Sequence, residues 1–198
     1  RKHGGIWLAL LLALLAAAVL APVAAMASEP QGIPIDTVHF PDATFRQYVK
    51  DNFDTNNDNV LSSDEIDGVT QINVNNKSIS NLTGIKYFTA LTSLNCYNND
   101  LTSLDVSGCT ELTNLYCDNN QLTSLDVSKN TKLKSLECYG NQLTSLDVSD
   151  CKALTYLYCE NNQLTSLDLS GCTALMMLDC YNNDLTSLDV SKNTKLKS

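Results

Sequence analysis

The sequence predicts an α/β solenoid whose 21-residue coils stack a short parallel β-sheet on one side, behind a helical N-terminal cap. Five near-identical blocks of 21 residues follow one another, with apolar residues at block positions 1, 4, 6, 11, 14 and 16. Such a fixed period is typical of solenoids, in which each coil packs only against its neighbours. A coil this short leaves little room for helix on its return side. The blocks begin at Leu91, Leu112, Leu133, Leu154 and Leu175, and a sixth opens at Leu196.

Each block carries the order L-x-x-L-x-C-x-x-N-x-L. This order resembles the leucine-rich-repeat signature, with cysteine where the consensus usually has leucine. The resemblance implies that block positions 4 and 6 face a buried core and that the short strands around them form a parallel sheet on the concave side. The cysteines of this column are Cys96, Cys117, Cys138, Cys159 and Cys180.

Residues 1–27 have the pattern of a secretory signal peptide. Arg1 and Lys2 precede an apolar run from Ile6 to Ala21, and Ala25-Met26-Ala27 fits the cleavage rule. An uncleaved membrane anchor is the alternative, because about 20 apolar residues can span a bilayer. Pro22 favours cleavage, after which we expect no membrane insertion. The remaining chain has 11 basic and 22 acidic residues, a net charge of −11, which argues against nucleic acid as a partner.

A linker over 28–37 and a helical cap over 38–69 are predicted to precede the repeats. The linker is short, polar and proline-containing. Pro41 and Asp42 are suitable helix starters. The aromatic and aliphatic residues around them follow a helical period; they are Phe40, Phe45, Tyr48, Val49 and Phe53.

The predicted cap helix leads into a twelve-residue stretch, Asp54 to Glu65, that matches the EF-hand calcium loop at every position but one. Asn59 stands where glycine is expected, but asparagine tolerates the left-handed backbone best among other residues. We expect a weak Ca²⁺ site; the alternative is a helix-loop-helix that closes the solenoid and binds no metal. The predicted ligands are Asp54, Asn56, Asp58 and Glu65, the Val60 carbonyl, and a water held by Ser62.

Residues 70–90 are predicted to form a divergent first repeat. Here the motifs F-P-D-A-T-F-R, V-T-Q-I-N-V and L-T-G-I-K-Y-F-T-A-L-T-S-L resemble the cap and first repeat of bacterial internalin-type and BspA-like surface proteins, over residues 38–198. That resemblance implies an EF-hand-like cap that need not hold metal. It also implies a secreted or cell-surface protein that binds host or neighbouring-cell components.

Three repeated polar or thiol columns are predicted to be structural. Asparagine at block position 9 should satisfy backbone groups inside the coil, and aspartate at position 15 should accept turn N–H groups. Position 19 alternates between cysteine and asparagine, as in Cys109 and Asn130, which a required disulfide would forbid. We therefore expect all eight cysteines to be buried free thiols. A run of calcium sites along the aspartates is the alternative for position 15.

Block positions 5 and 7 flank the inward position 6 and are predicted to point outward on the concave face. Tyrosine swaps between these columns from one repeat to the next, opposite Asn95 or a carboxylate. Exposed tyrosines suit a binding surface, although strand propensity alone also favours them. The predicted partner-binding residues are Tyr97, Tyr116, Asp118, Glu137, Tyr139, Tyr158, Glu160, Asp179 and Tyr181, and Tyr156, Met176 and Met177 extend the face.

No enzyme is predicted. After signal cleavage His39 is the remaining histidine, and the sequence has no G-x-S-x-G, phosphate-cradling loop or H-E-x-x-H motif. We expect a secreted or surface-displayed module that binds a protein ligand, on a host or neighbouring cell, through its concave face. The alternatives are a carbohydrate- or wall-binding region of a larger enzyme and a structural spacer. Because the sixth block stops after Ser198, we also expect a fragment of a longer chain.

Overall fold

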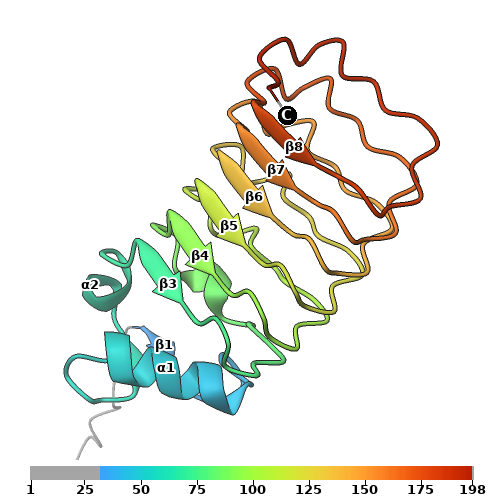
Figure 1. Cartoon of the computed structure of the whole chain (residues 1–198). Helices are drawn as coiled ribbons and strands as arrows, with labels where there is room; N and C mark the ends of the chain where they lie inside the picture. The colour runs from blue at the N-terminus through green and yellow to red at the C-terminus, as the bar shows by residue number, and fades with distance from the viewer. Residues whose placement is uncertain (1–31, 198) are drawn as a thin grey trace, which may run out of the picture.

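A computed structural model describes residues 32–197 as a curved stack of coils with a small helical cap at its N-terminal end (Figure 1). The predicted signal peptide, residues 1–27, lies outside the described residues. The cap consists of β1 (Ile33–Pro34), α1 (Ala43–Phe53), β2 (Val60–Leu61) and α2 (Ser63–Ile66). The described residues contain no helix that is both long and apolar enough to cross a membrane.

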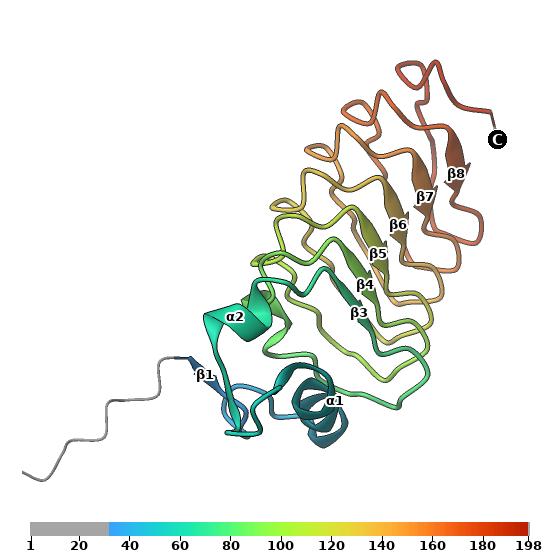
Figure 2. The same ribbon diagram turned by 90° about the vertical axis from the view of Figure 1, so that its left-hand side faces the viewer.

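The coils contribute one strand each to a six-stranded parallel sheet, in chain order from β3 to β8. From β4 to β8 neighbouring strands pair with a constant offset, so that Leu94 lies opposite Leu115 and Leu115 opposite Leu136. Figure 2 shows the strands along one side of the stack and the turns of the return side along the other. The strands are β3 (Gln71–Asn73), β4 (Ser93–Asn95), β5 (Asn114–Tyr116), β6 (Ser135–Glu137), β7 (Tyr156–Tyr158) and β8 (Met177–Asp179).

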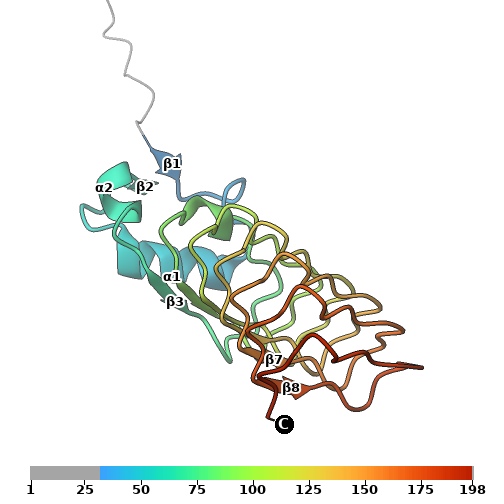
Figure 3. The same cartoon turned by 90° about the horizontal axis from the view of Figure 1, so that it is seen from above.

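The return side is made of turns, as the short repeat predicted. Its one helical piece in the described chain is the 3-10 helix η1 (Ile85–Tyr87), in the divergent first repeat. Seen from above, successive coils lie behind one another with their return sides aligned (Figure 3). The predicted solenoid, its repeat length and its parallel sheet are therefore confirmed.

The asparagine column inside the coils ties each repeat to the previous one. Asn120 Nδ2 donates to the carbonyls of Cys96 and Cys117, each at 3.1 Å, and its Oδ1 accepts from Leu101 N at 3.0 Å. Asn141 makes the equivalent contacts one repeat later. These bonds satisfy backbone groups that the chain leaves open where it turns away from the strand. The predicted structural role of this column is thus seen directly.

Cysteine and asparagine are interchangeable at position 19 because both point into the same buried corner and donate to the preceding repeat. Asn130 Nδ2 donates to Val106 O at 3.1 Å, and Cys172 Sγ lies 3.3 Å from Val148 O. All eight cysteines are free thiols, and all but Cys180 are buried. Burial raises the pKa of the Cys172 thiol to about 11, so this group stays protonated at neutral pH and packs as a small apolar residue.

The cap is joined to the first repeat by Asp42 and Gly84. The Asp42 carboxylate accepts from Thr44 N at 2.9 Å, which caps α1, and from Ser80 N at 3.0 Å in the first repeat. Gly84 has φ of 104° and lies so close to Phe40 that a Cβ there would come within 2.4 Å of the ring. Only glycine combines this backbone conformation with that close approach.

The segment predicted as a linker partly belongs to the cap. Ile33 pairs with Leu61 and Pro34 with Val60 in an antiparallel ladder, and Ile35 is buried. The apolar residues of this short segment have a core to pack against, which its polar and proline content did not indicate. The cap described by the structure therefore begins at β1 rather than at residue 38.

Candidate functional site: the concave sheet face

The outward residues of the concave face are set by the strand pleat. Leu115 and Cys117 are fully buried on either side of Tyr116, which is half-buried and faces outward. Since side chains alternate along a strand, the same holds from β4 to β7, and in the last repeat Leu178 and Cys180 are partly buried. Positions 5 and 7 therefore form two adjacent columns on the sheet, as predicted.

Tyrosines and acids form two interleaved zigzags on these columns. Because tyrosine changes column at every repeat, each strand places an acid beside a tyrosine of the next: Tyr116 is registered with Glu137, Glu137 with Tyr158, and Tyr158 with Asp179. A hollow of about 330 Å³ lies on this face and is lined by Asn95, Tyr97, Tyr116, Asp118, Glu137 and Tyr139. The structure thus brings together six residues that come from three repeats.

Two of the acids are much less exposed than their outward direction suggested. Asp118 is 2% exposed and Glu160 is 9% exposed, whereas Glu137 is half-buried. The sequence shows which way these side chains point. Their burial depends on the larger side chains that surround them from neighbouring repeats, such as Tyr139, whose hydroxyl lies beside the Asp118 carboxylate.

Desolvation raises the pKa of all three buried or half-buried acids on this face. For Glu137 the neighbouring carboxylates of Asp118 and Glu160 raise the pKa further, because each negative charge disfavours the next. Burial, together with Asp118, raises the pKa of Tyr139 to about 12. The ion pairs among the described residues involve none of these three acids. The face is therefore a locally anionic surface without an internal counter-charge.

The C-terminal end of the face is more apolar. Tyr156 is 39% exposed, Met177 is 36% exposed and Tyr181 is 55% exposed. The Tyr158 hydroxyl lies 3.7 Å from Met177 Sδ, across neighbouring strands. Apolar surface and tyrosine hydroxyls in one patch are typical of protein-binding surfaces.

The predicted calcium loop folds around its own carboxylates. Asp54 is 5% exposed and accepts from the N–H groups of Asp58 and Asn59, each at 3.1 Å. Asn59 has φ of 63°, the left-handed conformation expected of the residue that replaces glycine. The Glu65 carboxylate accepts from Ser62 N at 3.0 Å and Thr55 N at 2.8 Å. These bonds, that from Ser62 first, lower the pKa of Glu65 to about 2.

The Asp54 and Glu65 carboxylates of this loop accept hydrogen bonds from backbone N–H groups of the loop itself. Within residues 32–197, no three aspartate, glutamate, histidine or cysteine side chains converge as they would around a metal ion. Asn56 and Ser62 are placed in the loop as predicted, and Val60 lies in β2. The EF-hand-like character of the cap and its calcium binding stay predictions.

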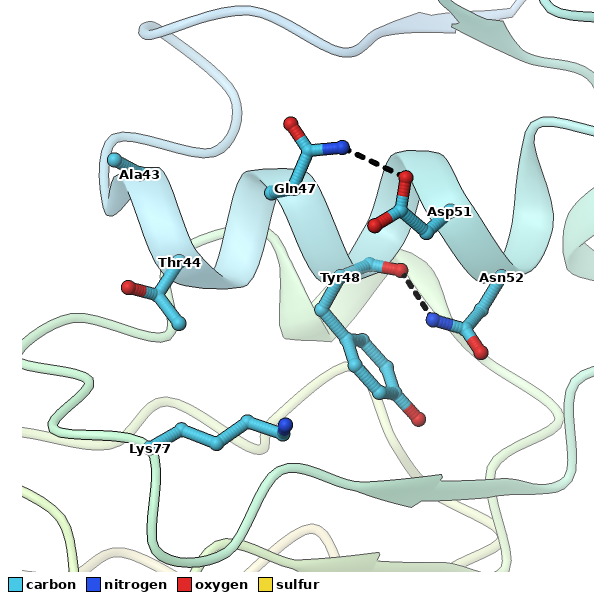
Figure 4. A pocket seen from close by; sticks show the side chains of 7 residues that line it. All are labelled: Ala43, Thr44, Gln47, Tyr48, Asp51, Asn52 and Lys77. Carbon is cyan, nitrogen blue, oxygen red and sulfur yellow. Dashed lines mark hydrogen bonds between the residues drawn. The ribbon is translucent and has the colours of Figure 1, made fainter.

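A polar groove of about 680 Å³ beside α1 was not foreseen from the sequence. Figure 4 shows the Tyr48 ring and the Lys77 side chain between the helix and the neighbouring strand. Gln47 donates to Asp51 at 2.7 Å and Asn52 to Tyr48 O at 2.8 Å, so part of the polar lining is already paired. The groove is lined by Ala43, Thr44, Gln47, Tyr48, Asp51, Asn52 and Lys77.

Comparison with known proteins agrees with this architecture. Residues 89–130 and 131–171 match the family described as Leucine Rich repeats (2 copies). The structure of the functional domain of InlJ from Listeria monocytogenes, described as including a cysteine ladder, superposes on 83% of this chain with 42% identity and a TM-score of 0.76. Internalin J of Listeria monocytogenes serotype 4b (strain F2365) is 44% identical over 68 residues. The chain is therefore similar to internalin-type bacterial leucine-rich-repeat proteins.

The similarity covers only part of each relative. The chain spans 36% of the solved InlJ domain and 7% of the full internalin J sequence. An internalin, inlF, from Listeria monocytogenes str. 4b F2365 has the same fold at 24% identity, with a TM-score of 0.72 over 86% of this chain and 52% of its own. Over the matched residues the chain is an internalin-like repeat module.

Proposed function

We propose that the concave face of this secreted or cell-surface module binds a protein ligand on a host or neighbouring cell. The observation that supports the proposal is the continuous zigzag of five tyrosines, Tyr97, Tyr116, Tyr139, Tyr158 and Tyr181, on a rigid parallel sheet. Four of these side chains, all but Tyr181, are half-buried, so little conformational entropy is lost when a partner covers them. Similarity to internalins supports a surface location and a protein partner.

The experiment that tests this function measures binding of the fluorescently labelled chain to cultured epithelial cells. A variant with Tyr116→Ala, Tyr139→Ala and Tyr158→Ala should lose at least about tenfold in affinity, since buried aromatic anchors contribute most of the energy of an interface. A matched control changes three exposed glutamines of the same repeats, Gln121→Ala, Gln142→Ala and Gln163→Ala, and should bind as the native chain does.

Treatment of the cells separates the kinds of ligand. Loss of binding after trypsin, with binding retained after enzymatic removal of glycans, supports a protein ligand. Loss after glycan removal alone, with binding retained after trypsin, overturns it in favour of carbohydrate binding. Native-level binding by the triple tyrosine variant, or no cell binding by any form of the chain, also overturns the proposal.

A further inference from the structure

One carboxylate on the concave face, that of Glu160, lacks a hydrogen-bond donor for one of its oxygens. Glu160 is only 9% exposed, and its Oε2 has no hydrogen-bond partner. A buried carboxylate oxygen without a donor is costly, and native proteins rarely keep one. The two other orphaned side-chain atoms in the described chain are the amide oxygens of Asn130 and Asn193, whose amide nitrogens donate to Val106 O and Leu169 O inside the coils.

Glu160 shares the concave face with Glu137 and Asp118, because it follows Tyr158, the register partner of Glu137, by two residues. Its charge acts on Glu137 across the neighbouring strand, and Asp118 acts on both glutamates. Glu137 accepts no hydrogen bond from any described residue, and it lines the hollow of the face together with Asp118. The three ion pairs among the described residues join His39 with Asp36, Lys86 with Asp105 and Lys132 with Glu111, all outside this group.

From the register of these residues and the unpaired oxygen of Glu160 we infer that Glu137 and Glu160 form a subsite for an arginine side chain of the ligand, flanked by the rings of Tyr139 and Tyr158. A guanidinium supplies several N–H donors in one plane, which can satisfy carboxylate oxygens from two successive repeats. It also stacks on tyrosine faces, which an ammonium does less well.

An organic cation fits this group better than a metal ion does. A metal requires several ligand atoms at about 2–2.6 Å from one centre, and no three such side chains converge in residues 32–197. Carboxylates distributed over successive repeats, with tyrosines between them, instead match a flat and extended cation. The raised pKa values of Glu137 and Glu160 agree with a site that lacks its counter-charge.

The test uses a blocked hexa-arginine peptide as the probe and hexalysine as its comparison, titrated calorimetrically into the chain at 0.15 M salt. Hexa-arginine should bind about tenfold more tightly than hexalysine. The double variant Glu137→Gln/Glu160→Gln should lose about tenfold in affinity for it. The control Asp150→Asn/Asp184→Asn removes the same charge from exposed positions elsewhere and should change the affinity by less than about twofold.

Equal affinity for both peptides, or equal loss in the two double variants, overturns the inference in favour of unspecific charge attraction. The arginine subsite rests on the proposed function of this face, but different results would overturn the subsite and the function. Cell binding that needs the tyrosines but is unchanged by Glu137→Gln/Glu160→Gln overturns the arginine subsite alone. Hexa-arginine binding that needs both glutamates supports the subsite, and if the chain then binds no cell-surface protein, the proposed function alone is overturned.

Discussion

Two sets of carboxylates recur along this solenoid, one on the concave face and one on the return side, and their surroundings differ. On the return side Asp126 accepts from Ser128 N and Asp147 from Ser149 N, each at 2.9 Å. These bonds lower the pKa of both aspartates. On the concave face burial and mutual repulsion raise the pKa of Glu137 and Glu160. The same repeat thus carries return-side aspartates whose ionised form the fold stabilises and concave-face glutamates whose ionised form it destabilises.

The difference shows how a repeat protein separates scaffold from recognition. An acid whose partners come from its own turn contributes the same bond in every coil, so its column is uniform. An acid without an internal partner contributes nothing to folding, so its column is free to vary between tyrosine, asparagine, aspartate and glutamate. Unsatisfied polar groups in a native protein are candidates for function.

The largest effect on stability is expected in the asparagine column, whose buried side chains are hydrogen-bonded. Its loss on substitution is the reference against which the acids are compared. Asn141→Ala leaves the buried N–H of Leu122 without a partner and removes one of the two amide donors to each of the carbonyls of Cys117 and Cys138. We expect a loss of about 2–4 kcal/mol in the free energy of unfolding, measured by urea denaturation. The adjacent exposed Gln142→Ala is the control and should be close to neutral; an equal effect of both would contradict the structural role.

Substitution of the concave-face acids should instead increase the free energy of unfolding. Glu137→Gln/Glu160→Gln removes two charges that are poorly solvated and repel each other, so we expect a gain of roughly 0.5–1 kcal/mol at pH 7. Because the pKa of each glutamate is higher in the folded state than in the unfolded state, the native chain loses stability as pH rises from the unfolded pKa to the folded pKa. The gain should therefore vanish below about pH 4, and a variant less stable than the native chain at pH 7 would contradict the comparison.

A smaller loss is expected on the return side. Asp126→Ala removes the acceptor of the Ser128 N–H, so the melting temperature should fall at neutral pH. Because the folded-state pKa of this aspartate is lowered, its contribution is present above the unfolded pKa and is lost as pH falls through the folded one. Thermal melts at pH 7 and pH 2 check this; a difference between variant and native chain that persists at pH 2 argues against a contribution from ionisation.

The smallest effect concerns the acids of the cap. If the loop from Asp54 to Glu65 binds Ca²⁺ as predicted, millimolar calcium should raise the melting temperature slightly and release heat in a titration, with a dissociation constant on the order of 0.1–1 mM. Asp58→Asn removes one predicted ligand and should weaken both signals. If no heat is released up to several millimolar calcium, the loop binds no Ca²⁺ and its acids, like those of the return side, only stabilise the fold.

Much of the candidate site followed from local pattern. The 21-residue period and the strand alternation were enough to place Tyr116, Glu137 and Tyr158 on one outward face, because the pleat acts within a single strand. The left-handed Asn59 and the helix cap at Asp42 were likewise predictable from residue type. The groove beside α1 was not, because its lining includes Lys77 of the first repeat, and only packing brings that residue to the helix.

The sequence by itself determined the solenoid, its inward columns and the tyrosine zigzag, since these depend on period and side-chain alternation along one chain. Only the tertiary structure decided that Asp118 and Glu160 are buried and that one Glu160 oxygen has no partner. It also decided that the strand at Ile33–Pro34 belongs to the cap. Burial and charge coupling are sums over side chains from several repeats, and such sums exist only after the coils have stacked.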